Sequence, residues 1–326
     1  MEMRKLGRTG IEVSRLGLGC ATFGREINEA TSFQIMDAAL EKGINLFDTA
    51  EAYGGGQARR YRCNQLGIND VREVGGEMHS SERILGRWLE SRGVRSRIIV
   101  QTKVSTNGTE SGVRDSLDAS LQRLQVDHLD IYLFHNYDPQ IPLEDGLAAF
   151  DQGICCGKIR FGGCSNFSAD QLFSGLELNR NNGLPRLEVV QPIYNMVCRK
   201  IEESLLPLCQ QEEVGVVTYS PLGAGFLAGK YSLDQGGIPK GTRFDVIPGH
   251  VDTYFHERSF RIVEQLRDKS EQTGISMVQL AMGWVLQRPD ISSVLIGARN
   301  EGHLRNALTA MEMNYPKEWM KEINAW

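Results

Sequence analysis

Four polar side chains of different chemistry fall at or just after strand-like apolar runs in the first half of the chain: Asp48, Tyr53, Lys103 and His135. A free tyrosine has a pKa of about 10, which is too high for efficient proton transfer near neutral pH. Because a nearby ammonium favours the phenolate, we expect Lys103 to lower the pKa of Tyr53. Asp48 would hold Lys103 in an ion pair, and His135 would donate a hydrogen bond to a carbonyl oxygen.

Together these groups would polarise a C=O bond and deliver a proton to its oxygen. The carbon would then need a hydride, which no side chain donates, so a nicotinamide cofactor is the natural source. Each residue also has a structural interpretation: a helix N-cap or barrel ion pair for Asp48, loop packing for Tyr53, a strand-end charge for Lys103 and a satisfied polar contact for His135. These interpretations weaken if all the groups fall on one surface.

The elements that must position these residues are short runs rich in Val, Ile, Leu and Phe. Longer amphipathic segments with helix start and stop signals separate them. Strand–helix alternation predicts a parallel sheet, and eight strands in 326 residues predict a (β/α)8 TIM barrel. The expected strands are 15–19, 44–49, 97–103, 128–134, 159–165, 187–192, 215–220 and 293–297.

In such a barrel the carboxyl ends of the strands carry the active site, so the four polar residues would share one mouth. Neighbouring strands lie ~4.8 Å apart, which puts Asp48 and His135 roughly 10 Å from each other. The segment MRKLGRTGIEVS before the first strand predicts a β-hairpin that caps one barrel end. We expect one domain over 1–326, with 57–80 as an inserted loop after the second strand that forms either a pocket lid or a surface excursion.

Composition excludes several classes of protein. The net charge is −5 and no basic stripe occurs, so a nucleic-acid partner is not expected. No apolar run approaches the ~20 residues that span a bilayer, and no apolar signal core begins the chain, so we expect a cytoplasmic protein without a membrane partner. The seven cysteines are an odd number without a CxxC pair, which disfavours a disulfide framework or a metal site. The oligomeric state is not readable.

The motifs around the four residues resemble those of the aldo-keto reductase superfamily, especially its bacterial and potassium-channel-β-subunit-like branches. LFDTAEAYGGG matches the segment of the catalytic aspartate and tyrosine, QTKV the lysine segment, and DIYLFHNYDPQIPLED the histidine segment. The similarity covers nearly the whole chain. It implies that Asp48, Tyr53, Lys103 and His135 form the catalytic set.

The resemblance also implies a cofactor site. In GGCSN and VVQPIYN, Ser165, Asn166 and Gln191 would hold the nicotinamide carboxamide, and Tyr219 would stack on the nicotinamide ring. TYSPLGAGFLAGKY resembles the loop over the pyrophosphate, and LIGARNEGHLRNAL the adenosine-phosphate segment. The other residues assigned to the cofactor are Ala21, Thr22, Ser220, Leu222, Gly223, Gly225, Leu227, Gly297, Arg299, His303 and Asn306.

Two departures from the family pattern concern cofactor and substrate. The family usually has glutamine at 303 and a Glu-Asn pair at 306 and 307, where this chain has His303, Asn306 and Ala307. NADP(H) is therefore expected mainly from Arg299, whose forked donors suit a 2′-phosphate, with NAD(H) as the alternative. The extra segment 57–80 is the second departure, because relatives pass almost directly from AYGGG to the next helix.

The expected function is reduction of a small-molecule aldehyde or ketone, sugars included, to an alcohol, with Tyr53 as general acid. The alternatives are a nicotinamide-binding regulatory subunit with little turnover, a sugar or polyol dehydrogenase that runs the reverse reaction, and a non-redox barrel enzyme such as an isomerase or hydrolase. Substrate-pocket residues are expected in 57–80 and around Phe23, Tyr137 and 224–255, where Tyr254 supplies an aromatic ring.

Overall fold

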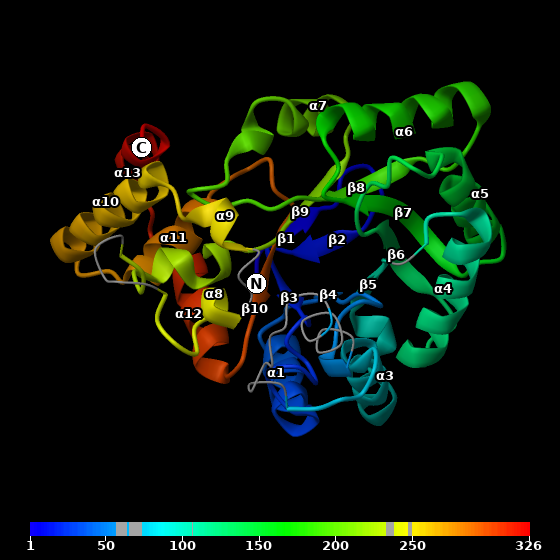
Figure 1. Cartoon of the computed structure of the whole chain (residues 1–326), viewed down its shortest axis with the longest axis horizontal. Helices are drawn as coiled ribbons and strands as arrows, with labels where there is room; N and C mark the ends of the chain where they lie inside the picture. Colours follow the sequence, from blue (N-terminus) through cyan, green and yellow to red (C-terminus); the bar gives the residue numbers. More distant parts are fainter. Residues whose placement is uncertain (57–63, 65–73, 106, 233–237, 247–249) are drawn as a thin grey trace.

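Eight parallel strands close into a barrel in the computed structural model, which describes residues 1–56, 64, 74–105, 107–232, 238–246 and 250–326 (Figure 1). All eight expected strand runs are confirmed. Neighbours in the chain are neighbours in the barrel, and the last strand pairs with the first. The barrel strands are β3 (Leu16–Gly19), β4 (Leu46–Asp48), β5 (Ile99–Val104), β6 (Leu129–Phe134), β7 (Ile159–Ser165), β8 (Leu187–Gln191), β9 (Gly215–Thr218) and β10 (Ser293–Gly297).

Helices surround the barrel and cover the outer faces of the strands (Figure 1). In the described part of the chain the α-helices are α1 (Glu29–Glu41), α3 (Ser80–Arg92), α4 (Glu110–Leu124), α5 (Leu143–Cys155), α6 (Ala169–Asn182), α7 (Leu205–Gln211), α8 (Arg243–Val246), α9 (Val251–Tyr254), α10 (Glu257–Thr273), α11 (Met277–Leu286), α12 (Glu301–Glu312) and α13 (Lys317–Asn324). Single 3₁₀ turns occur at η1 (Arg95–Arg97) and η2 (Lys200–Glu202), and η3 (Gly223–Ala228) is a longer 3₁₀ segment with a kink at Ala224 and Gly225.

The helix boundaries follow local capping chemistry. Ser168 and Ser276 each form a complete capping box at the start of α6 and α11. Helix α3 starts at the expected serines, but its N-cap is His79, which has left-handed backbone and makes no side-chain cap. The hydroxyls of Ser80 and Ser81 instead donate to the carbonyls of Phe23 and Cys20. These serines therefore connect α3 to the loop after β3 rather than cap it.

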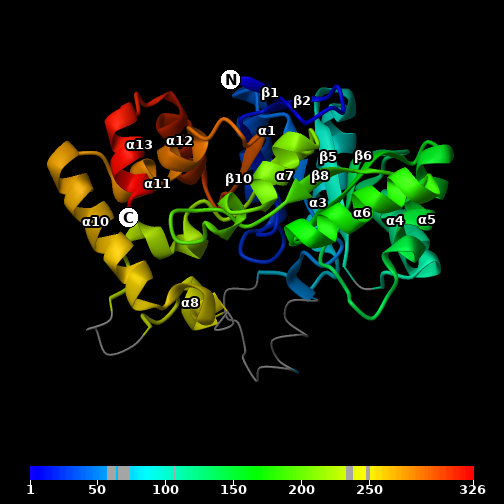
Figure 2. The same cartoon turned by 90° about the horizontal axis from the view of Figure 1, so that it is seen from above.

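The N-terminal segment forms the expected hairpin, from β1 (Met3–Lys5) and β2 (Glu12–Ser14). Leu6, Ile11 and Val13 are buried and join the side chains that fill the barrel interior. Figure 2 shows the hairpin at one end of the molecule and α8 at the opposite end. The predicted cap is confirmed, and it covers the amino ends of the strands.

Within the described residues, no helix has the length and apolar character needed to cross a membrane. Most of the inserted loop, residues 57–63 and 65–73, lies outside the described residues. Its expected roles as a lid or a surface excursion therefore stay predictions.

Candidate active site

An ion pair between Lys103 and Asp48 lies at the carboxyl ends of two adjacent strands. Lys103 Nζ is 2.7 Å from Asp48 Oδ1 and 2.8 Å from Oδ2, and it also donates to the carbonyl of Thr49 at 2.7 Å. The Lys103 side chain is fully buried, and burial lowers its pKa while the Asp48 carboxylate opposes that effect. Three acceptor contacts therefore satisfy the ammonium away from solvent.

Two amide side chains complete the surroundings of Asp48. Gln101 Nε2 and Gln191 Nε2 donate to Asp48 Oδ1 at 2.7 and 2.9 Å. Both glutamines are buried, and they come from β5 and from β8 across the barrel. Gln191, which the resemblance assigns to the nicotinamide carboxamide, thus lies directly beside the Asp48–Lys103 pair.

The Tyr53 ring lies between the ammonium and the imidazole. Lys103 Nζ is 4.8 Å from the ring centroid, and the rings of Tyr53 and His135 meet edge to face with centroids 5.5 Å apart. The structure therefore brings all four predicted residues together at one mouth of the barrel. This arrangement matches what the strand ends predicted.

The pKa of Tyr53 is raised rather than lowered as expected, and the causes of the shift are groups other than Lys103. Burial raises the pKa of Tyr53, and the Asp48 carboxylate raises it further. The physical reason is that both burial and a neighbouring carboxylate disfavour the negatively charged phenolate. Tyr53 is therefore a phenol that holds its proton at neutral pH.

His135 is a neutral imidazole at neutral pH. Burial, and then the charge of Lys103, lower the pKa of His135 to about 3. Its Nδ1 lies 2.6 Å from Ser105 Oγ, and the backbone N–H of Ser105 donates to Glu51 Oε1 at 2.6 Å. A neutral imidazole carries one proton, so this side chain can donate a hydrogen bond from the other ring nitrogen.

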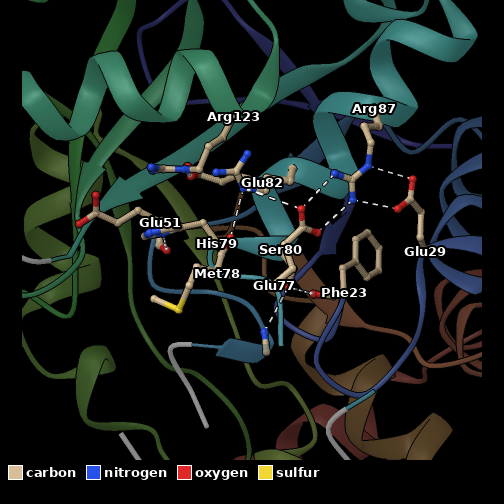
Figure 3. A network of polar contacts seen from close by, with 12 residues as sticks. Phe23, Glu29, Glu51, Glu77, Met78, His79, Ser80, Glu82, Arg87 and Arg123 are labelled. Carbon is tan, nitrogen blue, oxygen red and sulfur yellow. Dashed lines mark hydrogen bonds and ion pairs between the residues drawn. The ribbon is translucent and has the colours of Figure 1, made fainter. Parts of the chain in front are cut away.

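The start of α3 holds the loop that carries Tyr53 (Figure 3). The Ser80 hydroxyl donates to the Phe23 carbonyl at 3.2 Å and accepts from the Gly55 N–H at 3.1 Å. His79 Nδ1 lies 2.6 Å from the Glu51 carbonyl. These contacts join the loop after β3, the Tyr53 loop and α3 in one packed unit.

Glu77, near the end of the inserted loop, is bound to the surrounding helices. Figure 3 shows Arg87 of α3 between two carboxylates, Glu29 of α1 and Glu77. Its guanidinium donates to Glu29 at 2.8 and 2.9 Å and to Glu77 at 3.2 and 3.3 Å. Arg87 thus holds Glu77, which precedes in the chain the two residues, His79 and Ser80, that contact the Tyr53 loop.

The expected carboxamide residues form a polar cluster beside the tetrad. Tyr219 OH donates to Asn166 Oδ1 at 2.7 Å, and Asn166 Nδ2 donates to the His135 carbonyl at 3.0 Å. The buried Ser165 hydroxyl donates to the Gln191 carbonyl at 2.9 Å. Asn166 has a left-handed backbone with φ of 61°, which turns its amide back toward the strand ends. The cluster offers amide donors and acceptors next to an aromatic ring.

The loop after β9, which the resemblance assigns to the pyrophosphate, has an unusual backbone conformation. A run of positive φ angles occurs at Ser220, Gly223, Ala224 and Gly225, and glycine tolerates this conformation without strain. Leu227 is buried and its N–H donates to the Leu222 carbonyl, so these two leucines serve the packing of the turn.

The expected adenosine-phosphate residues lie on the surface after β10, where Gly297, Arg299 and His303 are exposed. Partial desolvation of the imidazole first, and then the charges of Arg299 and Lys230, lower the pKa of His303. Arg299 also lies 3.5 Å from Glu26, a carboxylate that pairs with Arg243 of α8 as well. A positive cluster with one internal carboxylate therefore occupies this end of the site.

The remaining assigned residues are placed around this cluster. Thr22 Oγ1 donates to the Ala298 carbonyl at 3.2 Å, which joins the loop after β3 to the end of β10, and Ala21 is half-buried beside it. Asn306 is exposed on α12, whereas Ala307 is buried in the core. Position 307 therefore serves helix packing in this chain.

These geometric findings agree with the comparison of sequences. The profile of the aldo/keto reductase family matches residues 15–326. The chain belongs to the aldo/keto reductase family. It is 31% identical to the uncharacterized oxidoreductase YrpG of Bacillus subtilis (99% of this chain, 95% of the relative) and to the aldo-keto reductase YhdN of the same organism (99% and 93%). It is 29% identical to a probable voltage-gated potassium channel subunit beta of Arabidopsis thaliana (96% and 92%).

The residues of this aldo/keto reductase fit a nicotinamide cofactor, which the family generally uses. Asn166 and Gln191 are amides that match the donors and acceptors of a carboxamide. The turned backbone around Gly223 and Gly225 and the cations Lys230 and Arg299 match phosphate chemistry. Within the described residues, no group of His, Cys, Asp and Glu is arranged to hold a metal ion.

Two of the expected substrate-pocket residues lie elsewhere. Phe23 is fully buried and Tyr254 is 1% exposed, and both belong to the hydrophobic core. Tyr137 lines a surface groove of about 540 Å³ between α5 and α6, together with Ile141 and Phe173. None of the four tetrad residues lines that groove, so the geometry of the tetrad, not the groove, defines the candidate active site of this aldo/keto reductase.

Sequence reasoning missed three residues that contact the tetrad: Gln101, Ser105 and Glu51. Gln101 and Ser105 stand two residues before and two residues after Lys103, and the side chains of a strand alternate with a period of two. That spacing predicts that all three side chains point the same way, and it could have found both. Glu51 lies between Asp48 and Tyr53 in the same motif, where no spacing rule distinguishes a buried carboxylate from a surface one.

Proposed function

We propose that the protein is an NADP(H)-dependent oxidoreductase that reduces an aldehyde or ketone to an alcohol, with Tyr53 as the proton donor. The observation that carries the proposal is the Tyr53 ring packed between the Lys103 ammonium and the His135 imidazole at one barrel mouth. Tyr53 carries its proton in the free protein, and its transfer requires that the Lys103 ammonium stabilise the phenolate once substrate and cofactor are bound.

Each side chain has a separate task in this proposal. Tyr53 gives its proton to the oxygen of the carbonyl as negative charge develops there. Neutral His135 donates a hydrogen bond to the same oxygen, and the Lys103 ammonium stabilises the phenolate that forms. Asp48 keeps Lys103 in place. A bound reduced nicotinamide supplies the hydride that the carbonyl carbon requires.

The choice of NADP(H) over NAD(H) rests on charge. Arg299 and Lys230 are close enough to His303 to lower its pKa, so positive charge concentrates where the resemblance puts the adenosine phosphate. A guanidinium binds a 2′-phosphate with two parallel hydrogen bonds. Arg299→Ala is expected to raise the KM for NADPH by about 10-fold or more while the KM for NADH changes little. Equal effects on both cofactors would contradict this assignment.

The test of the proton donor is Tyr53→Phe, with Tyr315→Phe as the matched control. Tyr315 lies in the C-terminal segment, where its hydroxyl contacts the Leu280 carbonyl. Loss of a general acid typically costs about 10²- to 10⁴-fold, so kcat of Tyr53→Phe should fall by that factor with NADPH affinity unchanged. Tyr315→Phe should keep its turnover. Near-normal turnover of Tyr53→Phe refutes the proton-donor role.

The substrate class is tested by NADPH consumption over a panel of aldehydes, ketosugars and diketones, repeated with NADH and, in the reverse direction, with sugars and polyols plus NADP⁺. Reduction of any carbonyl supports the proposal. NADPH binding without turnover on the whole panel would favour a regulatory subunit instead. Absence of nicotinamide binding, measured by fluorescence quenching, would overturn the redox assignment.

A further inference from the structure

Ser105 lies between a buried carboxylate and the ring of His135. Its backbone N–H donates to Glu51 Oε1 at 2.6 Å, and its hydroxyl oxygen lies 2.6 Å from His135 Nδ1. Glu51 is buried, and its own backbone contacts Lys103 and His79 through its N–H and its carbonyl. The backbone of Ser105, which carries the hydroxyl, is thus held by a carboxylate residue that is itself held on two sides.

The direction of the hydrogen bond between Ser105 and His135 decides where the imidazole carries its proton. Because His135 is neutral, one ring nitrogen is protonated and the other accepts. If the hydroxyl donates to Nδ1, the proton is on Nε2. If Nδ1 donates instead, the hydroxyl hydrogen needs another acceptor, and among the described residues the hydroxyl contacts only His135. The first arrangement gives the hydroxyl hydrogen an acceptor within the site, so it is favoured over one that leaves this hydrogen to solvent.

We propose that Ser105 is a positioning residue that holds His135 in the tautomer with the proton on Nε2, and that Glu51 fixes Ser105 for this task. The inference rests on the proposed function, because it gives His135 the donor that a carbonyl oxygen requires. Ser105 does not itself contact the reacting atoms. It selects which nitrogen of the ring faces them as a donor.

The direct test is the tautomer of His135, measured by ¹⁵N NMR on protein labelled at histidine. The chain has 6 histidines, and His135→Asn identifies the signals of this ring by their loss. In the wild-type protein Nε2 should give the chemical shift of a protonated nitrogen and Nδ1 that of an acceptor. In Ser105→Ala the two nitrogens should move toward each other as the tautomers mix, whereas Ser105→Thr, which keeps the hydroxyl, should retain the wild-type pattern.

The second readout is turnover. Ser105→Ala should lower kcat by about 10- to 100-fold, the range seen when a group that orients a metal-binding histidine is removed, with the KM for NADPH unchanged. Ser105→Thr should restore most of that loss. The matched control is Ser91→Ala on α3, whose hydroxyl contacts the Trp88 carbonyl, and it should change neither readout.

The outcomes separate this inference from the proposed function. A wild-type His135 protonated on Nδ1, or an Nε2 proton that persists unchanged in Ser105→Ala, overturns the role of Ser105 whatever the activity. If no carbonyl is reduced, the proposed function fails, while the NMR pattern still decides the tautomer. If Ser105→Ala does not fold, the wild-type pattern and a Ser105→Thr that keeps it support the inference, and any other pattern refutes it.

Discussion

Asp48 and Lys103 form an ion pair in a place where neither charge is tolerated alone. Lys103 is fully buried and Asp48 is 3% exposed, so each depends on the other and on the amides of Gln101 and Gln191. Removing one partner of a buried pair leaves an uncompensated charge, whereas replacing both with neutral residues costs much less. The same two side chains therefore affect both the stability of the barrel mouth and its chemistry.

Lys103→Met should lower the free energy of unfolding by about 3–5 kcal/mol, because it leaves Asp48 buried without its counter-charge. The double variant Asp48→Asn/Lys103→Met should regain part of that stability, while turnover stays lost in both. Urea unfolding curves and kcat measured on the same samples check this. A double variant no more stable than Lys103→Met would show that the pair is not the source of the loss.

The loop with Tyr53 depends on two close approaches to Ser80 at the start of α3. Gly24 has φ of +70°, and a Cβ atom there would meet Ser80 Oγ at 2.2 Å. Gly54 has φ of +142°, and its Cβ would lie 2.7 Å from the same oxygen. Only glycines let the loop after β3 and the Tyr53 loop both reach one serine. The position of the catalytic phenol is thus set partly by backbone atoms.

Gly24→Ala and Gly10→Ala form a matched pair that tests this packing. Gly10, in the hairpin turn, also has positive φ of +75° but has nothing within 4 Å of its Cβ. Gly10→Ala should cost ~1–2 kcal/mol from backbone strain alone and leave kcat unchanged. Gly24→Ala should cost more and should also lower kcat, because Ser80 must move. Equal losses of stability with equal kcat would contradict the proposed connection.

At the scale of the molecule, the two ends of the barrel have different tasks. The mouth holds the polar tetrad, while the amino end is closed by the apolar side chains of the hairpin. In (β/α)8 barrels the carboxyl end of the strands usually carries the active site, and the amino end serves stability. Substitutions at the two ends should therefore have separable effects.

Leu6→Ala should lower the free energy of unfolding by about 2–5 kcal/mol, because Leu6 is fully buried against the start of β9. Its kcat should match that of the wild-type protein. Met3→Ala is the control, since Met3 is 42% exposed and should contribute little. Urea unfolding with kcat at 25 °C checks both, and a large drop in kcat for folded Leu6→Ala would argue against the division.

The sequence predicted the barrel well because each strand is a short apolar run and several helices, such as α6 and α11, carry capping signals. It also predicted where Asp48, Lys103 and His135 meet, since strand ends are readable from a pattern. It did not predict that burial would raise the pKa of Tyr53, because burial is a property of the assembled fold. The spacing of Ser105 from Lys103 indicates that the two side chains lie on the same face of the strand, but the contact of Ser105 with His135 also depends on strand register and on side-chain rotamers.

The closed amino end of the barrel limits the routes by which ligands can enter and leave. Since Leu6, Ile11 and Val13 fill that opening, no molecule can enter or leave along the barrel axis at the amino ends of the strands. The interior side chains of the barrel close the same axis above the hairpin. A cofactor and a carbonyl compound would therefore both have to enter and leave at the carboxyl ends of the strands, so an occupant of that single entrance would hinder the exchange of the other.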